Sequence, residues 1–245
     1  MAEFPHLVHA PIQEALIDFR VEHLISPAKG RFEAFGERLA LQYPRKQELR
    51  LLQAQVTFSE GDVSNNQSTS FRGIRLDSDE RHFVVQAQTD GLTVSRLAPY
   101  LDWEELVSEA KAVWQLYVEL VDPSTVVRVA TRFINRFAIP GERIELDDYF
   151  RTLPKVPALL PQALSGFFVN IQIPDSSKSH TISLTQAMEV EVDKDQVFLV
   201  DIDVFRATML DTRSAEVWSI LSMMRQAKNE TFFAVLSDKA IGLFR

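Results

Sequence analysis

The sequence predicts an α+β fold: a tandem duplication of a β-α-β(3-4)-α unit, with a curved antiparallel sheet backed by long helices. Two segments, 15–22 and 127–137, carry this prediction because both alternate apolar and charged residues. Each is followed by a helix-compatible stretch, several strands and a Trp-bearing amphipathic helix. Self-similarity over about half the chain is typical of internal duplication. We therefore expect a first repeat at residues 1–124 and a second at 125–245, closely packed on the first.

The first half contains the clearest element, a long helix that begins after Asp102. Asp102 and Glu105 form a capping box, and apolar residues recur at helical spacing from Trp103 to Val118. An earlier helix is expected to start at Ser26-Pro27, because Ser caps a helix and Pro fits its first turn. Around these helices the pattern predicts strands at about 14–22, 50–58, 69–76, 81–88 and 92–97, a polar surface loop at 61–69 and a tight turn at Asp90-Gly91.

The second half repeats this plan, beginning with a strand at about 126–139. A short helix is expected at 146–151, and a long helix at about 213–228. The apolar tail 231–244 is expected to dock as a further helix. Between them the alternation predicts a meander of strands at about 166–173, 181–190 and 196–206. This order resembles the TATA-binding-protein-like and helix-grip folds, an analogy that concerns fold alone.

Composition limits the classes of function. The 245 residues include no Cys, which excludes disulfides and thiolate metal sites. No stretch approaches the roughly 20 apolar residues that span a bilayer, so we expect no membrane partner and a cytoplasmic location. The net charge of −8 argues against nucleic acid as a partner, because such binding relies on Lys and Arg contacts with phosphates.

Strand alternation separates a charged face from the apolar one. In the strand at 126–139, three arginines lie opposite the apolar residues, and in the strand near 200 two aspartates do the same. Arginine forks bind phosphate and carboxylate well, which favours a ligand- or partner-binding face. The alternative is a set of cross-strand ion pairs that keep an open sheet soluble. The predicted binding residues are Arg20, Arg128, Arg132, Arg136, Asp201 and Asp203.

Asn135 is predicted to be structural. It shares the strand face of Phe133 and Phe137, so its amide should turn toward the helices. A buried amide needs partners. We expect it to bond to backbone near Pro140-Gly141 or the following helix.

Motifs for catalysis, metal binding and cofactors are missing from the sequence. There is no phosphate loop, no dinucleotide fingerprint, no nucleophile elbow and no His-Glu-x-x-His pattern. We therefore predict no catalytic residues, no metal and no cofactor.

Two motifs resemble a family of sporadically distributed prokaryotic proteins. The segments are 10–20, which reads Ala-Pro-Ile-Gln-Glu-Ala-Leu-Ile-Asp-Phe-Arg, and 128–136, which is similar to the family motif Arg-x-x-x-Arg-[aromatic]-Ile-Asn-Arg. The chain departs from the family near its end, where Met223-Met224-Arg225 stands in place of a helical His. The family's scattered distribution implies mobile bacterial genes, and hence a role beside a partner in a defence or toxin–antitoxin locus.

These observations favour a non-enzymatic binding protein that interacts with another protein or forms a homo-oligomer. The alternative is a sensor or enzyme that holds a small anionic ligand, such as a nucleotide, on the Arg-lined face.

Overall fold

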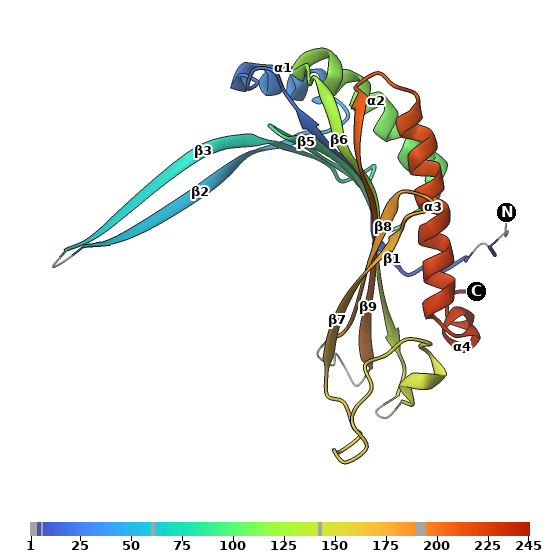
Figure 1. Cartoon of the computed structure of the whole chain (residues 1–245). Coiled ribbons are helices and arrows are strands. Elements are labelled where there is room, and N and C mark those ends of the chain that lie inside the picture. Colours follow the sequence, from blue (N-terminus) through green and yellow to red (C-terminus); the bar gives the residue numbers. More distant parts are fainter. Residues whose placement is uncertain (1–3, 6, 60–61, 142–143, 190–194) are drawn as a thin grey trace.

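The chain folds around one antiparallel sheet with helices against one of its faces (Figure 1). The computed structural model describes residues 4–5, 7–59, 62–141, 144–189 and 195–245, with the backbone alone at 54–59 and 62–66. Within these residues the sheet has nine strands in the order β2-β3-β4-β5-β1-β6-β9-β8-β7. The predicted α+β class and antiparallel pairing are confirmed.

The first half forms one side of the sheet. β1 lies near the centre, between β5 and β6, and pairs antiparallel with both. Asp102 caps α2 as predicted, since its carboxylate accepts a hydrogen bond from the Glu105 amide at 2.7 Å. The elements are β1 (Ile12–Glu22), α1 (Lys29–Leu39), β2 (Arg45–Ser59), β3 (Asp62–Ser78), β4 (Phe83–Gln88), β5 (Gly91–Leu97) and α2 (Trp103–Val121).

The second half forms the other side. β6 pairs with β1 at the centre and with β9 beyond it. No helix among the described residues is long and apolar enough to cross a membrane. The elements are β6 (Thr125–Ile139), a 3-10 turn (Leu146–Asp148), β7 (Phe167–Asp175), β8 (His180–Met188), β9 (Gln196–Asp211), α3 (Glu216–Val235) and α4 (Asp238–Gly242).

The core lies between the sheet and its helices. Phe19 of β1 and Phe133 of β6 are fully buried, as the alternation predicts. Trp114 of α2 stacks on Phe19 with ring centroids 4.4 Å apart, and Trp103 packs on Phe133 at 6.3 Å. Each large buried side chain contributes about 1.5–3 kcal/mol, so these contacts hold α2 across the two central strands.

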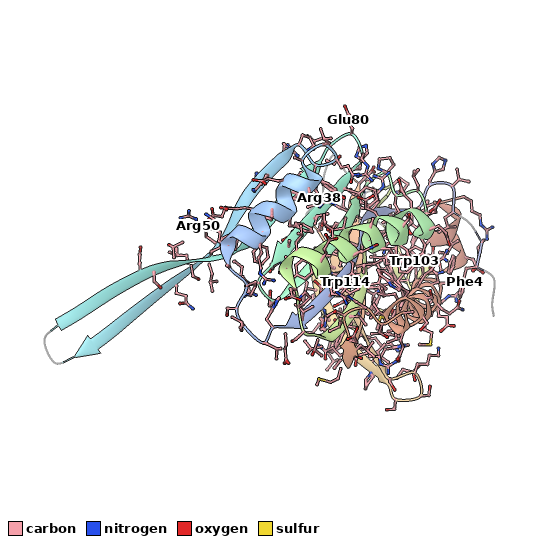
Figure 2. The ribbon with its side chains drawn as sticks, turned by 90° about the horizontal axis from the view of Figure 1, so that it is seen from above. Phe4, Arg38, Arg50, Glu80, Trp103 and Trp114 are labelled. Carbon is pink, nitrogen blue, oxygen red and sulfur yellow. The ribbon has the colours of Figure 1, made fainter. Side chains whose placement is uncertain are left out.

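The clearest departure from the predicted elements is a long hairpin. Instead of a polar loop at 61–69, β3 extends back to Asp62 and pairs with β2 over its whole length. β3 contacts β4 only from Gly73 to Ser78, so the outer part of β2 and β3 projects from the body as a two-stranded arm (Figures 1 and 2). The arm is defined here as Arg50–Ser59 of β2 and Asp62–Phe71 of β3.

A bulge marks the base of the arm. The register of β2 and β3 shifts between Leu49 and Arg50, and Gly73 opposite has a φ of +151°. A Cβ at position 73 would lie 2.1 Å from the carbonyl oxygen of Ala87. Glycine is therefore required where the ribbon leaves the sheet.

Three helix boundaries also differ. α1 begins at Lys29 after Ala28, which makes no side-chain cap, so Ser26 is not the N-cap. The expected short helix at 146–151 is a single 3-10 turn. α3 continues to Val235 and takes up the start of the tail expected to dock separately, which leaves only the short α4.

Candidate functional site

The face of the sheet away from the helices, called the open face, carries the predicted arginines. Arg128 donates to Asp18 at 3.0 Å and to Asp203 at 3.2 Å. Its guanidinium also lies over the Phe205 ring, 4.7 Å from the centroid. Arg128 thus joins three strands, because Asp18 is on β1 and Asp203 on β9.

Asp18 is the centre of this network. Its carboxylate also accepts hydrogen bonds from Arg20 at 3.0 and 3.1 Å and from the Thr93 hydroxyl at 2.7 Å. It is only 6% exposed. The predicted site did not include Asp18, although its place in the alternation on β1 puts it on the same face as Arg20.

Arg132 forms a two-pronged pair with Asp201, at 2.8 Å from Nε and 2.5 Å from Nη2. This hydrogen bonding raises the pKa of Arg132. Burial raises the pKa of Asp203, against the opposing charges of Arg128 and Arg132. The structure therefore brings Arg20, Arg128, Arg132, Asp201 and Asp203 together.

Arg136 lies apart from that group. Its Nε donates to Glu189 at 2.8 Å, and both side chains are more than a third exposed. A pair with Asp201 or Asp203 was the cross-strand alternative, and the structure shows neither: Asp201 lies on the diagonal of both arginines, but both of its oxygens bond to Arg132.

The open face is therefore rich in charge, but each of its predicted arginines has a carboxylate partner within the chain. A ligand that used these arginines fully would have to displace an internal carboxylate. Cross-strand pairing accounts for their positions, and the prediction that they bind a ligand or partner stays a prediction.

Asn135 is buried at 2% exposure, as predicted, and bonds to backbone. Its amide nitrogen donates to the carbonyl of Val200 at 2.9 Å and of Phe133 at 3.3 Å. The partners are thus the neighbouring strand β9 and its own strand, not the Pro140-Gly141 turn. Val200 stands directly opposite Asn135 in the pairing of β6 with β9, so the amide reaches the backbone of the adjacent strand.

A cavity of about 900 Å³ lies on the helix side of the sheet. Its walls come from the N-terminal segment, from the turn before α2 and from α3, with Phe133 and Asn135 of β6 in its lining. Phe4 and Trp103, two of its lining residues, lie at the end of the molecule opposite the arm (Figure 2). The sequence predictions did not include this site, because it joins segments about 100 and 200 residues apart.

Lys228 of α3 lines this cavity, with its Nζ 3.9 Å from the centroid of the Phe133 ring. Burial, with a smaller contribution from the charge of Arg225, lowers the pKa of its amine to about 7. A signal was present in the sequence: Lys228 stands four residues after Met224 and four before Phe232, both of which are buried. A lysine within the apolar stripe of a helix is an exception that points to a site.

Metal binding has less support than the two sites above. Among the described residues, no group of three His, Asp or Glu side chains is arranged to hold a metal ion.

A scan of protein-family models and searches of curated proteins and solved structures found no match to this chain.

Proposed function

We propose that the protein is a non-enzymatic binding protein that engages another protein through its projecting arm. The observation that carries this proposal is the arm itself, which extends beyond β4 and pairs with nothing else in the described chain. Ten residues of strand span about 33 Å. A structure of that length separates a contact point from the body of the molecule.

The composition of the arm favours contact with a partner protein over full exposure to solvent. Leu51 and Leu52 at its base are 44% and 64% exposed. From position 51 to 71 the sequence contains only two charged residues, Glu60 and Asp62. A two-stranded ribbon alone is marginally stable in water, and natural sheet edges are usually protected by charge. An uncharged edge favours strand addition by a partner.

The test is a shortened arm. Residues 52–69 are replaced by Asn-Gly, so that the turn joins Leu51 to Ser70. In an antiparallel pair of strands, directly opposed residues alternate between hydrogen-bonded and non-hydrogen-bonded pairs. Leu51 and Ser70 form the same type of pair as Ser59 and Asp62, the outermost described pair of β2 and β3, so a two-residue turn fits there. Pull-down with mass spectrometry should identify a protein that the full-length chain enriches and the shortened chain does not. The resemblance to the prokaryotic family implies that a neighbouring gene encodes this protein.

Matched point variants sharpen this test. Leu52→Lys should weaken the interaction, and Leu159→Lys should not, because Leu159 is 99% exposed in a loop away from the arm. The contact is to be reproduced with the two purified proteins. A partner that binds the shortened protein equally well would contradict the role of the arm, whereas loss of self-association on shortening would identify a second copy of this chain as the partner.

The second function, a sensor or enzyme for a small anion on the open face, draws support from one observation. Arg132 and Arg136 have side chains 43% and 44% exposed. Arg132 uses two of its five N–H groups on Asp201, so others remain for a ligand. Thermal-shift measurements with nucleotides would favour this function if saturable stabilisation appeared and vanished in Arg132→Ala.

We also infer that residues 1–124 and 125–245 arose as two copies of one β-α-β(3-4)-α unit. The strand order supports this, because β5, β4 and β3 follow β1 outward on one side as β9, β8 and β7 follow β6 on the other. α2 and α3 each come after the last strand of their half. A TATA-binding-protein-like or helix-grip relationship is part of the same proposal.

A further inference from the structure

The cavity beside α3 and the amine of Lys228 together point to a second binding site. We propose that this cavity binds a small aromatic organic anion, whose carboxylate or sulfonate group pairs with Lys228 and whose ring packs against the aromatic walls. The proposed site lies at the opposite end of the molecule from the arm (Figure 2), and it is independent of the proposed interaction with a protein.

The walls suit a flat apolar body. A volume of about 900 Å³ lies within the range of small-molecule sites. Tyr100 meets Phe133 edge-on at 5.7 Å between ring centroids, and Phe4 stacks on Phe233 at 4.9 Å. Trp103 packs on Phe133 from α2. Aromatic side chains thus enter the lining from four separate parts of the chain.

The charge of the cavity selects an anion. Among the described residues, no carboxylate forms an ion pair with Lys228 and no hydrogen bond to its amine is present, although a partly buried ammonium is costly without a partner. Arg225, one turn earlier on α3, is held by Glu104 at 3.1 Å. Asp102 is the one carboxylate in the described lining, and its oxygen accepts the Glu105 amide. A ligand without a hydrogen-bond acceptor would leave the amine unpaired, a cation would be repelled, and an anion would compensate the charge.

A second buried cation on the helix side of the sheet has a carboxylate partner, so the lack of one beside Lys228 is a local feature. Arg96 of β5 is 4% exposed and donates to Glu105 at 2.9 Å. The fold therefore supplies a carboxylate to a buried cation close to α2, but supplies none to Lys228 within the described chain.

Binding should depend on pH through the Lys228 amine. Because its pKa is lowered to about 7 by burial, the amine carries a full charge only in acid, and an anion is bound more tightly there. The other titratable groups that line the cavity are His9, Tyr100, Asp102 and Arg225. All of them remain when Lys228 is replaced, so a comparison of variants isolates the lysine.

The experiment uses two fluorescent probes of similar shape, the anion 8-anilinonaphthalene-1-sulfonate and the neutral N-phenyl-1-naphthylamine. Lys228→Met should weaken binding of the anion about tenfold, the range of a charged hydrogen bond, and leave binding of the neutral probe equal or stronger. Lys228→Arg should recover part of the affinity. Lys155→Met, which removes a charge from an exposed loop, should change neither.

Between pH 6 and 9 the affinity of the unchanged protein for the anion should fall, and it should fall more steeply than the affinity of Lys228→Met. Equal affinity of the anion for Lys228→Met and the unchanged protein would overturn the proposal. The proposal would also be overturned if Lys228→Met lost affinity for both probes equally without a lower melting temperature, since the lysine would then shape the cavity without pairing with the anion.

Discussion

Two cationic regions of the molecule differ in how their charges are compensated. On the open face, Arg20, Arg128 and Arg132 each meet a carboxylate of a neighbouring position or strand. In the cavity, Lys228 meets the face of the Phe133 ring and, in the described chain, no carboxylate. Carboxylates of the fold itself compensate the charges of the arginines on the open face. Among the described residues, no carboxylate does this for the single lysine in the cavity.

The cause lies in the elements that carry each charge. A sheet aligns acids and bases across its strands, because residues of one face recur at every second position. Arg132 therefore has Asp203 as its cross-strand neighbour and Asp201 on the diagonal. α3 instead places Lys228 over β6, where the side chains of that face are Phe133 and Asn135. No acid is available from the strand below.

The largest expected effect concerns Asp18, the centre of the open-face network. Asp18→Ala leaves Arg20 and Arg128 without their shared carboxylate and should lower the free energy of unfolding by about 3 kcal/mol, in the range for breaking a buried pair. Urea denaturation followed by circular dichroism measures this. Asp90→Ala is the matched control: Asp90 also binds Arg20 and Arg72, but its side chain is 40% exposed, so it should lose less than about 1 kcal/mol. Similar losses in both variants would show that the open face is not held by a buried network.

The next effect concerns Lys228 and has the opposite sign. Lys228→Met should raise the free energy of unfolding at pH 7 by about 2 kcal/mol, because it removes a desolvated amine. The pKa of this amine is about 7 in the folded protein and roughly 10.4 when unfolded. Between these values the unfolded chain binds more protons, so the stability of the unchanged protein should rise with pH from 7 to 10.

Lys228→Met lacks this titration, and the stability difference between the two proteins should shrink toward pH 10. Urea denaturation at several pH values measures it. A difference that stays constant with pH would mean that the lysine is not desolvated in the folded state, and that the contrast with the arginines is false.

The sequence predicted the centre of the molecule well and its ends poorly. The segments 14–22 and 126–139 became β1 and β6, and Asp102 capped α2, because alternation and capping are local signals. The arm was missed because polar residues such as Gln67 and Ser68 read as a loop, while their pairing with β2 is decided by the partner strand. Asn135 was correctly placed in the core, but its acceptor is the backbone of Val200, which stands opposite it on β9, and that pairing is decided by the partner strand.

The candidate site was likewise predicted only in part from the sequence. Which arginines share a face follows from the period of a strand, so Arg128 and Arg132 were found. Their partners depend on register: Arg132 takes Asp201, and Arg136 takes Glu189. The cavity forms where four distant segments of the chain meet, and the one local sign of it was a lysine in the apolar stripe of α3.

The smallest effect is expected at Arg136, which tests the outer limit of the open-face network. Its pair with Glu189 is exposed on both sides, and exposed pairs contribute little after screening by solvent and salt. Arg136→Ala should therefore change the free energy of unfolding by less than about 0.5 kcal/mol, measured by urea denaturation at low and high salt. If the open face also binds a partner, the same variant should weaken that binding while the fold stays intact. A loss as large as that of Asp18→Ala would instead place Arg136 inside the structural network, and the two cationic regions would then differ even more sharply than the distances indicate.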